Sequence, residues 1–239
     1  MKKVTCFFRL ILPIIVFQLG FNASVSACQH ANAKTHKKLL KTTIADARED
    51  HYDLKYTKLT IALNNNNTNI AGSVVYYAVV SNPLMNEYVF ELLSTIQIDS
   101  IFVNNQLCTY TRNANVVTVP LSSAMTAGTF FTTKIVYHGT PTSGTGFFSA
   151  GINTIASPSW GNKVTYTLSA SYHGFEWFPC KQSLKDKIDS SSVWITVPDS
   201  LKAGSNGLLN KVTSLPNNLK RFEWSTKYPI DYYLYAKHH

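Results

Sequence analysis

The sequence predicts an all-β protein with antiparallel sheets, and its composition and its periodicity both indicate this. Thirteen Tyr, thirteen Phe and four Trp accompany long runs of Val, Thr and Ile, which are residue types that favour strands. From Tyr52 onward, no segment keeps a helical period of apolar residues over three turns. With 239 residues, 45% of them hydrophobic, the chain is long enough to bury a core in one large or two small domains.

Apolar segments alternate with turn residues at short intervals, which is the pattern of a meander. The expected strands are 54–63, 70–80, 88–93, 95–103, 107–111, 116–121, 130–137, 164–168, 193–197, 208–213, 221–225 and 232–235. The expected turns are Asn64–Asn67, Asn82–Pro83, Asn104–Asn105, Asn113–Asn115, Ala127–Gly128 and the stretch Gly139–Gly146. We interpret the Asn64–Asn67 tract as a turn with room for positive φ.

Two groups of tyrosines, Tyr76–Tyr77 and Tyr232–Tyr235, raise the idea of a platform for sugars or bases. Adjacent side chains of a strand point to opposite faces, so half of them normally fill the core. We therefore expect core packing for these rings rather than ligand contact.

The amino terminus predicts an export signal, a signal peptide of residues 1–27. Three cations form its positive end, residues 10–21 its apolar stretch, and Val25-Ser26-Ala27 a cleavage site of small residues. The segment is too short and too interrupted for a membrane span. We expect the protein to be exported to the periplasm or cell envelope.

Val25-Ser26-Ala27-Cys28 also resembles the bacterial lipobox, which makes Cys28 a candidate lipidation site. Ordinary cleavage after Ala27 fits the same residues, so both alternatives stay open. A lipid anchor would be the one contact with a membrane, and it would place the protein among outer-membrane lipoproteins. Residues 28–51 are polar and basic, and we expect a short tether there, followed by a single β-domain over residues 52–239.

The net charge of +9 resembles that of a nucleic-acid-binding protein until the position of the cations is considered. Three of them lie in the signal peptide, which leaves an excess of six. Part of this excess lies in His36-Lys37-Lys38 and Lys41, and the rest is scattered. Because no basic stripe results, we expect no nucleic-acid binding.

The sequence lacks the motifs of common catalytic sites: it has no H-E-x-x-H, no G-x-S-x-G, no phosphate-binding glycine loop and no Cys or His pairs at zinc spacing. Five of the seven His are far apart in sequence, and the adjacent His238 and His239 point to opposite faces if extended, so no ready metal site results. We therefore expect no catalytic residue, metal ligand or cofactor in this chain. Once residues 1–28 are set aside, Cys108 and Cys180 remain, as a bridge or as two buried thiols, and we favour thiols.

One segment, residues 167–187, is more informative than the rest; it reads T-L-S-A-S-Y-H-G-F-E-W-F-P-C-K-Q-S-L-K-D-K. It resembles the stretch that precedes the catalytic domain in the aminopeptidase N family of zinc metallopeptidases, where T-[QL]-S-E-P-x-x-A-x-x-W-F-P-C is followed by a polar pair and a D-K ending. Further pieces follow the order of that family: 72–74, 103–105, 137–141, 146–148, 197–198, 205–207 and 228–234. The resemblance spans about residues 52–236.

The resemblance implies a saddle-shaped antiparallel β-sandwich, the amino-terminal lobe that covers the active-site cleft of a thermolysin-like catalytic domain. In the family, a G-x-M-E-N loop and an H-E-x-x-H-x18-E zinc site follow this lobe, and neither occurs in these 239 residues. The full-length enzyme would hold zinc and trim peptide amino termini, whereas the lobe alone would be inert.

The same resemblance assigns Leu168, Ser169, Ala170 and Ser171 to the loop that faces the substrate cleft. Most members place an acidic residue at the position of Ala170, where its carboxylate pairs with the free α-amine of the peptide. A methyl group cannot bind an ammonium group, so this contribution of the lobe is in doubt.

The loop ends in a structural motif, Trp177, Phe178, Pro179 and Cys180, and we expect the two aromatic rings in the core.

A second function from another class fits the same residues: a stand-alone, lipid-anchored β-sandwich that binds a peptide or a protein through its former cleft-facing side. Ala170 and the candidate anchor at Cys28 favour it. A broad apolar face near residues 168–178 would instead favour a missing partner domain. A carbohydrate-binding sandwich is a third, weaker alternative, which would need a planar row of exposed Tyr or Trp.

Overall fold

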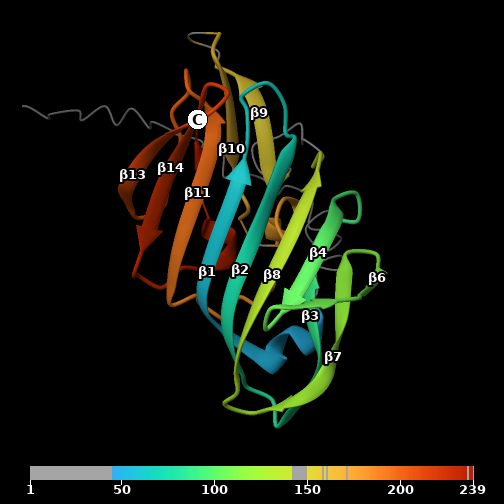
Figure 1. Ribbon diagram of the computed structural model, residues 1–239. Coiled ribbons are helices and arrows are strands. Elements are labelled where there is room, and N and C mark those ends of the chain that lie inside the picture. The colour runs from blue at the N-terminus through green and yellow to red at the C-terminus, as the bar shows by residue number, and fades with distance from the viewer. Residues whose placement is uncertain are drawn as a thin grey trace, which may run out of the picture. The chain divides into compact units, whose positions relative to one another are not determined.

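The computed structural model describes residues 45–141, 150–157, 159, 161–170, 172–235 and 237–238, and the expected all-β fold is confirmed (Figure 1). The large sheet has eight strands in the spatial order β13 (Leu208–Leu215), β14 (Leu219–Thr226), β11 (Ser190–Pro198), β1 (Tyr52–Ala62), β2 (Ile70–Val80), β8 (Phe130–Gly139), β4 (Gln97–Val103) and β5 (Gln106–Cys108). A four-stranded sheet has the order β12 (Gly204–Ser205), β15 (Lys237–His238), β10 (Lys163–Thr167) and β9 (Ile152–Ala156). A three-stranded sheet has the order β3 (Leu84–Glu91), β7 (Val116–Thr126) and β6 (Thr111–Asn113).

The central strands of the large sheet bury alternate side chains, because successive residues of a strand point to opposite faces. Leu59 and Ile61 of β1 are fully buried, whereas Lys58 and Thr60 are only half-buried. We call the buried side the inner face and the other the outer face.

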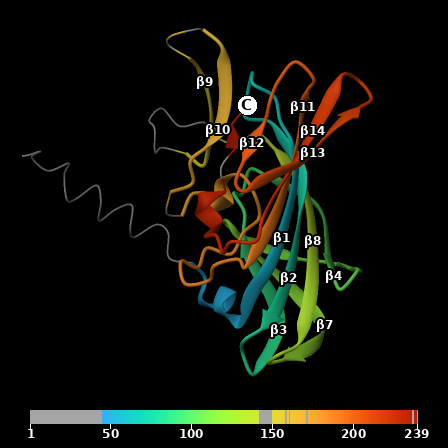
Figure 2. The same ribbon diagram turned by 90° about the vertical axis from the view of Figure 1, so that its left-hand side faces the viewer.

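Both smaller sheets lie against the inner face. The ring of Tyr88 in β3 lies 5.2 Å from Tyr52 of β1 and 6.0 Å from Phe131 of β8. The Tyr76 hydroxyl of β2 also lies on the inner face and donates a 2.6 Å hydrogen bond to the Pro179 carbonyl oxygen. In the view of Figure 2 the four-stranded sheet accordingly lies on one side of the large sheet. The candidate loop 168–180 is thus part of the layer that covers the core.

One strand pair departs from the antiparallel expectation. β1 and β11 pair in parallel, from Tyr56 opposite Ser190 to Ala62 opposite Thr196. The other described pairs between named strands are antiparallel. A parallel pair needs a long crossover, and here the crossover contains β2 to β10.

Several expected turns are confirmed by backbone geometry. Asn104 and Asn105 join β4 to β5 with φ values of 49° and 65°, which Asn tolerates better than most residues. Between β1 and β2, the Asn64 Oδ1 atom accepts hydrogen bonds from the backbone N–H groups of Asn66 and Asn67 at 2.8 and 3.1 Å. The Asn side chains therefore close this turn themselves.

Two expected elements were wrong, and one strand was missed. Residues 232–235 form a 3-10 helix, η3 (Tyr232–Leu234), because both Tyr232 and Tyr235 turn into the core, which a strand does not allow at a spacing of three. The expected strand 107–111 is divided between β5 and β6, which belong to different sheets. β9 was not expected at all, since it follows a stretch rich in Gly, Ser and Thr.

Residues 47–51, which the sequence placed in the tether, form a 3-10 helix, η1 (Ala47–His51), that packs on the domain with Glu49 buried. The signal peptide, Cys28 and residues 29–44 lie outside the described residues. Cys108 and Cys180 are both free thiols, as the sequence favoured; Cys180 is buried and Cys108 half-buried.

Candidate functional site

The loop from Leu168 to Cys180 follows directly on β10 and is fastened at its start. The Leu168 backbone N–H donates to the Gly151 carbonyl oxygen at 3.1 Å. The Ser169 hydroxyl is buried and accepts a 2.7 Å hydrogen bond from the Trp177 indole Nε1. Ser169 thus fixes the loop internally and does not face solvent.

The W-F-P-C motif holds the end of the loop in the core. Trp177 and Phe178 are fully buried, with ring centroids 4.3 Å apart. Cys180 and Glu91 of β3 exchange two backbone hydrogen bonds, of 2.9 and 3.0 Å. Burial raises the pKa of the Cys180 thiol well above its usual value, and the nearby carboxyl groups add to the effect. Cys180 is therefore an inert packing residue rather than a nucleophile.

The residues assigned to the substrate cleft do not share one environment. Leu168 is half-buried, Ser169 is buried and Ala170 is exposed, while Ser171 lies outside the described residues. Ala170 is thus the described member of this set that is most open to a ligand, and it has no polar side chain to offer. Their role in a cleft stays a prediction.

A hydrogen-bonded pair of side chains that the sequence analysis missed lies within the candidate loop. His173 Nδ1 lies 2.6 Å from Glu176 Oε1, and Glu176 Oε2 accepts a 2.7 Å hydrogen bond from the Gly151 backbone N–H. This contact with Glu176 raises the pKa of His173, against the opposing effect of burial. The carboxylate of Glu176, which belongs to the loop itself, is therefore already engaged by two groups of its own chain. The spacing H-x-x-E was the signal that could have revealed it.

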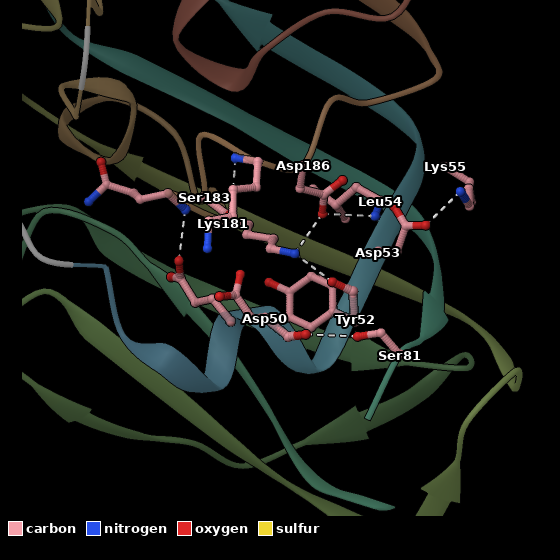
Figure 3. A network of polar contacts seen from close by, with 12 residues as sticks. Asp50, Tyr52, Asp53, Leu54, Lys55, Ser81, Lys181, Ser183 and Asp186 are labelled. Atoms are coloured by element: carbon pink, nitrogen blue, oxygen red, sulfur yellow. Dashed lines mark hydrogen bonds and ion pairs between the residues drawn. The ribbon is translucent and has the colours of Figure 1, made fainter. Parts of the chain in front are cut away.

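A buried polar network, also missed, follows the W-F-P-C motif (Figure 3). The Lys181 ammonium donates to the Tyr52 carbonyl oxygen and to Asp186 Oδ2, the latter at 2.6 Å. The same Asp186 oxygen accepts from the Leu54 backbone N–H at 3.1 Å. Burial raises the pKa of Asp186, and Lys181 lowers it. The network joins the loop to the start of β1.

Next to it, Gln182 bridges two acidic side chains. Its backbone N–H donates to Glu49 Oε2 and its Nε2 to Glu91 Oε2, both at 2.7 Å. Burial raises the pKa of Glu49 well above its usual value, and repulsion from Glu91 adds to this. Burial also raises the pKa of Glu91, whereas Gln182 lowers it. The burial of Glu49 close to a second buried carboxyl group favours the protonated form of Glu49.

Metal binding has no support in these residues. Within the described ranges, no group of three or more His, Cys, Asp or Glu side chains could hold a metal ion. A catalytic zinc needs three protein ligands and an open position, and the described side chains do not fit it. The described part of the chain also contains no helix long and apolar enough to cross a bilayer.

Solved structures with a similar fold include M1 zinc metallopeptidases. The chain superposes on an M1 zinc metallopeptidase from Deinococcus radiodurans with a TM-score of 0.70 and 21% identity, covering 79% of this chain and 42% of that one. The fold is that of the amino-terminal part of M1 zinc metallopeptidases.

Two further solved structures agree with this fold. An E323A mutant of the Deinococcus radiodurans enzyme bound to the substrate Tyr-Ser-Ala gives the same TM-score of 0.70. Yeast LTA4 hydrolase in complex with bestatin matches with a TM-score of 0.64 and 17% identity, over 82% of this chain and 29% of the hydrolase. The chain thus spans less than half the length of these M1-like relatives. No known family description and no curated protein matches it by sequence.

Proposed function

We propose that this chain is the amino-terminal lobe of an exported zinc aminopeptidase, in which it covers the active-site cleft of a thermolysin-like catalytic domain. By itself the lobe has no peptidase activity. The zinc and the reaction belong to the catalytic domain, and the lobe helps to enclose the peptide amino terminus. Export to the periplasm or cell envelope, with or without a lipid at Cys28, is part of the proposal and rests on the sequence of residues 1–28.

The observation that most supports this function is the fold match over 79% of the chain to an M1 enzyme that has been solved with a bound peptide.

The chain's own residues would position the loop rather than take part in the chemistry. Trp177 and Ser169 fix its conformation, and the Lys181–Asp186 pair fixes the segment that follows. With Ala170 at the exposed position, recognition of the substrate ammonium would fall to groups outside this loop.

The proposal is tested by the mass and the activity of the natural product. The intact mass of the protein from its own cells should exceed 26.7 kDa, and this longer protein should release amino-terminal residues from peptides in a chelator-sensitive manner. The purified 239-residue chain, supplied with zinc, should show no such release. Chelator-sensitive turnover by the short chain would overturn its assignment as an inert lobe.

The alternative is a stand-alone, lipid-anchored β-sandwich that binds a peptide or protein. The exposed, uncharged Ala170 favours it, since the residue retains no contact that aminopeptidase chemistry would use. A natural mass equal to residues 28–239, with or without an added lipid, would replace the first proposal by this one.

A further inference from the structure

The outer face of the large sheet bears aromatic rings that the core does not use. By strand alternation their neighbours point inward, and these rings point outward. We call them the outer aromatic set: Tyr56, Tyr77, Phe102, Phe130 and Trp194. Tyr77 is 49% and Phe130 77% exposed. The contacts of Tyr88 place the three-stranded sheet on the opposite face, and the four-stranded sheet lies on that side as well (Figure 2), so no described sheet covers these rings.

Positive charge accompanies the rings. The Lys58 ammonium lies 3.3 Å from the centroid of the Trp194 ring, and the Arg221 guanidinium carbon lies 4.4 Å from it. Glu223 is held by Arg221 at 2.7 Å. Among the described residues, no carboxylate lies within ion-pair distance of Lys58 or Lys134, so this part of the face has a surplus of positive charge.

Burial lowers the pKa of Lys58; Glu223 acts against this, and the charge of Arg221 adds to it. An anion bound at this position would stabilise the ammonium group.

The strand register puts these groups in rows across the sheet. Lys58 lies opposite Val75, Val75 opposite Lys134, and Lys134 opposite Phe102. With neighbouring strands about 4.8 Å apart, the two lysines are about 10 Å apart in one row. Tyr56 and Tyr77 form the next row, with ring centroids 5.3 Å apart.

A shallow hollow of about 240 Å³ opens on this face; its lining includes Tyr77, Phe102, Thr132 and Lys134. It combines ring faces, a hydroxyl group and a cation within one concave surface.

We propose that the outer face of the large sheet binds an acidic polysaccharide. The exposed rings of Tyr77 and Phe130 would stack on the C–H faces of the sugars, and Lys58 and Lys134 would pair with sugar carboxylates. Hydroxyl side chains on the same face, among them Thr60, Thr132 and Ser192, suit the sugar hydroxyls.

Single-stranded nucleic acid also stacks on aromatic rings, but it presents a phosphate at every nucleotide and is bound along a positively charged groove. Two lysines outside ion-pair distance of the described carboxylates, and one arginine that is already paired, fit a sparsely charged polymer better. The inference does not depend on peptidase activity, because the outer face lies on the side of the sheet opposite the candidate loop.

The test uses the full 239-residue chain and measures binding to polygalacturonate at low salt by calorimetry and by retardation in a gel that contains the polymer. We expect binding that weakens as salt rises. Lys134→Gln and Tyr77→Ser should each weaken it about three- to tenfold, the effect of one exposed cation or ring contact. The matched controls Lys185→Gln and Tyr228→Ser, which change an exposed lysine and an exposed tyrosine outside the sheet, should leave it unchanged.

Unfolding midpoints of all four variants show whether a loss of binding is a loss of folding. If polygalacturonate does not bind, or if the control variants bind as weakly as the test variants, the proposal is overturned. Equal affinity for a neutral glucan would refute the role of the acidic groups. Tighter binding of oligo(dT) than of polygalacturonate would assign the face to nucleic acid instead.

Discussion

Replacing Lys181 by Met should strongly destabilise the domain, because it leaves a buried carboxylate without its counter-charge. The side chains of Lys181 and Asp186 are only 4% and 8% exposed, so water can replace little of the lost contact. The change also removes the donor that satisfies the Tyr52 carbonyl oxygen. Breaking a buried pair from one side costs about 3–5 kcal/mol. We expect a loss of this size in the free energy of unfolding at pH 7.

The effect should depend on pH in a defined direction. Burial already raises the pKa of Asp186, and Lys181 opposes this. Without Lys181 the pKa rises further. A carboxyl group whose pKa is higher in the folded than in the unfolded protein stabilises the fold at pH values below its pKa in the unfolded protein. This contribution is lost as the pH rises through its pKa in the folded protein. The cost of Lys181→Met should therefore shrink as pH falls toward 3.8, the ordinary value for Asp.

Urea unfolding followed by tryptophan fluorescence measures these differences. Adding Asp186→Asn to Lys181→Met removes the stranded charge and should recover about 2 kcal/mol. Lys187→Met is the matched control, since Lys187 is 62% exposed and lies 3.9 Å from Asp231; its effect should stay below about 1 kcal/mol. A loss below about 1 kcal/mol for Lys181→Met, or no recovery in the double variant, would refute the reasoning.

Three further predictions concern single buried groups. Glu49→Gln should raise the free energy of unfolding at pH 8 by about 1–3 kcal/mol. The pKa of the native Glu49 carboxyl group is raised, so its contribution to stability is lost as the pH rises above 4.5, and the variant should show a flatter dependence of stability on pH. An unchanged pH profile would contradict this. Trp177→Phe should lower the free energy of unfolding in urea by about 2–4 kcal/mol, because it leaves a cavity and removes the 2.7 Å hydrogen bond to Ser169. A loss below about 1 kcal/mol would argue against the buried contact. When the thiols of the native chain are titrated, Cys108→Ala should remove one reactive thiol, whereas Cys180→Ala should remove none until urea is added. If Cys180→Ala lowers the number of rapidly reacting thiols in the native chain, Cys180 is accessible.

Strand position could be predicted well from the sequence because alternation and turn chemistry are local. Ile70–Val80 was expected at the bounds that the structure shows, and Asn104–Asn105 was expected as a turn. Pairing is not local. Nothing in residues 54–63 distinguishes a parallel partner from an antiparallel one, so the pairing of β1 with β11 could not be predicted.

The candidate loop was identified by its resemblance to a family, and only some of its interactions could be predicted from the sequence. The burial of Trp177 follows from its chemistry, whereas the pairing of Lys181 with Asp186 depends on a loop that returns five residues later. Glu49 was assigned to the tether because its neighbours are polar, and only tertiary packing buries it. Long-range burial of charged groups is what a single sequence does not reveal.

The parallel pairing of β1 with β11 also constrains the order in which the chain can fold. During synthesis, β1 can pair with β2 at once, but its other edge has no partner until residues 190–196 have emerged. Until then Leu59 and Ile61 lie on a strand with one free edge, which is a template for pairing with other chains. The pairing of β1 with β11 in the centre of the sheet is thus one of the last steps of folding during synthesis. Until it forms, either fast synthesis of the second half of the chain or a chaperone would have to protect the free edge of β1.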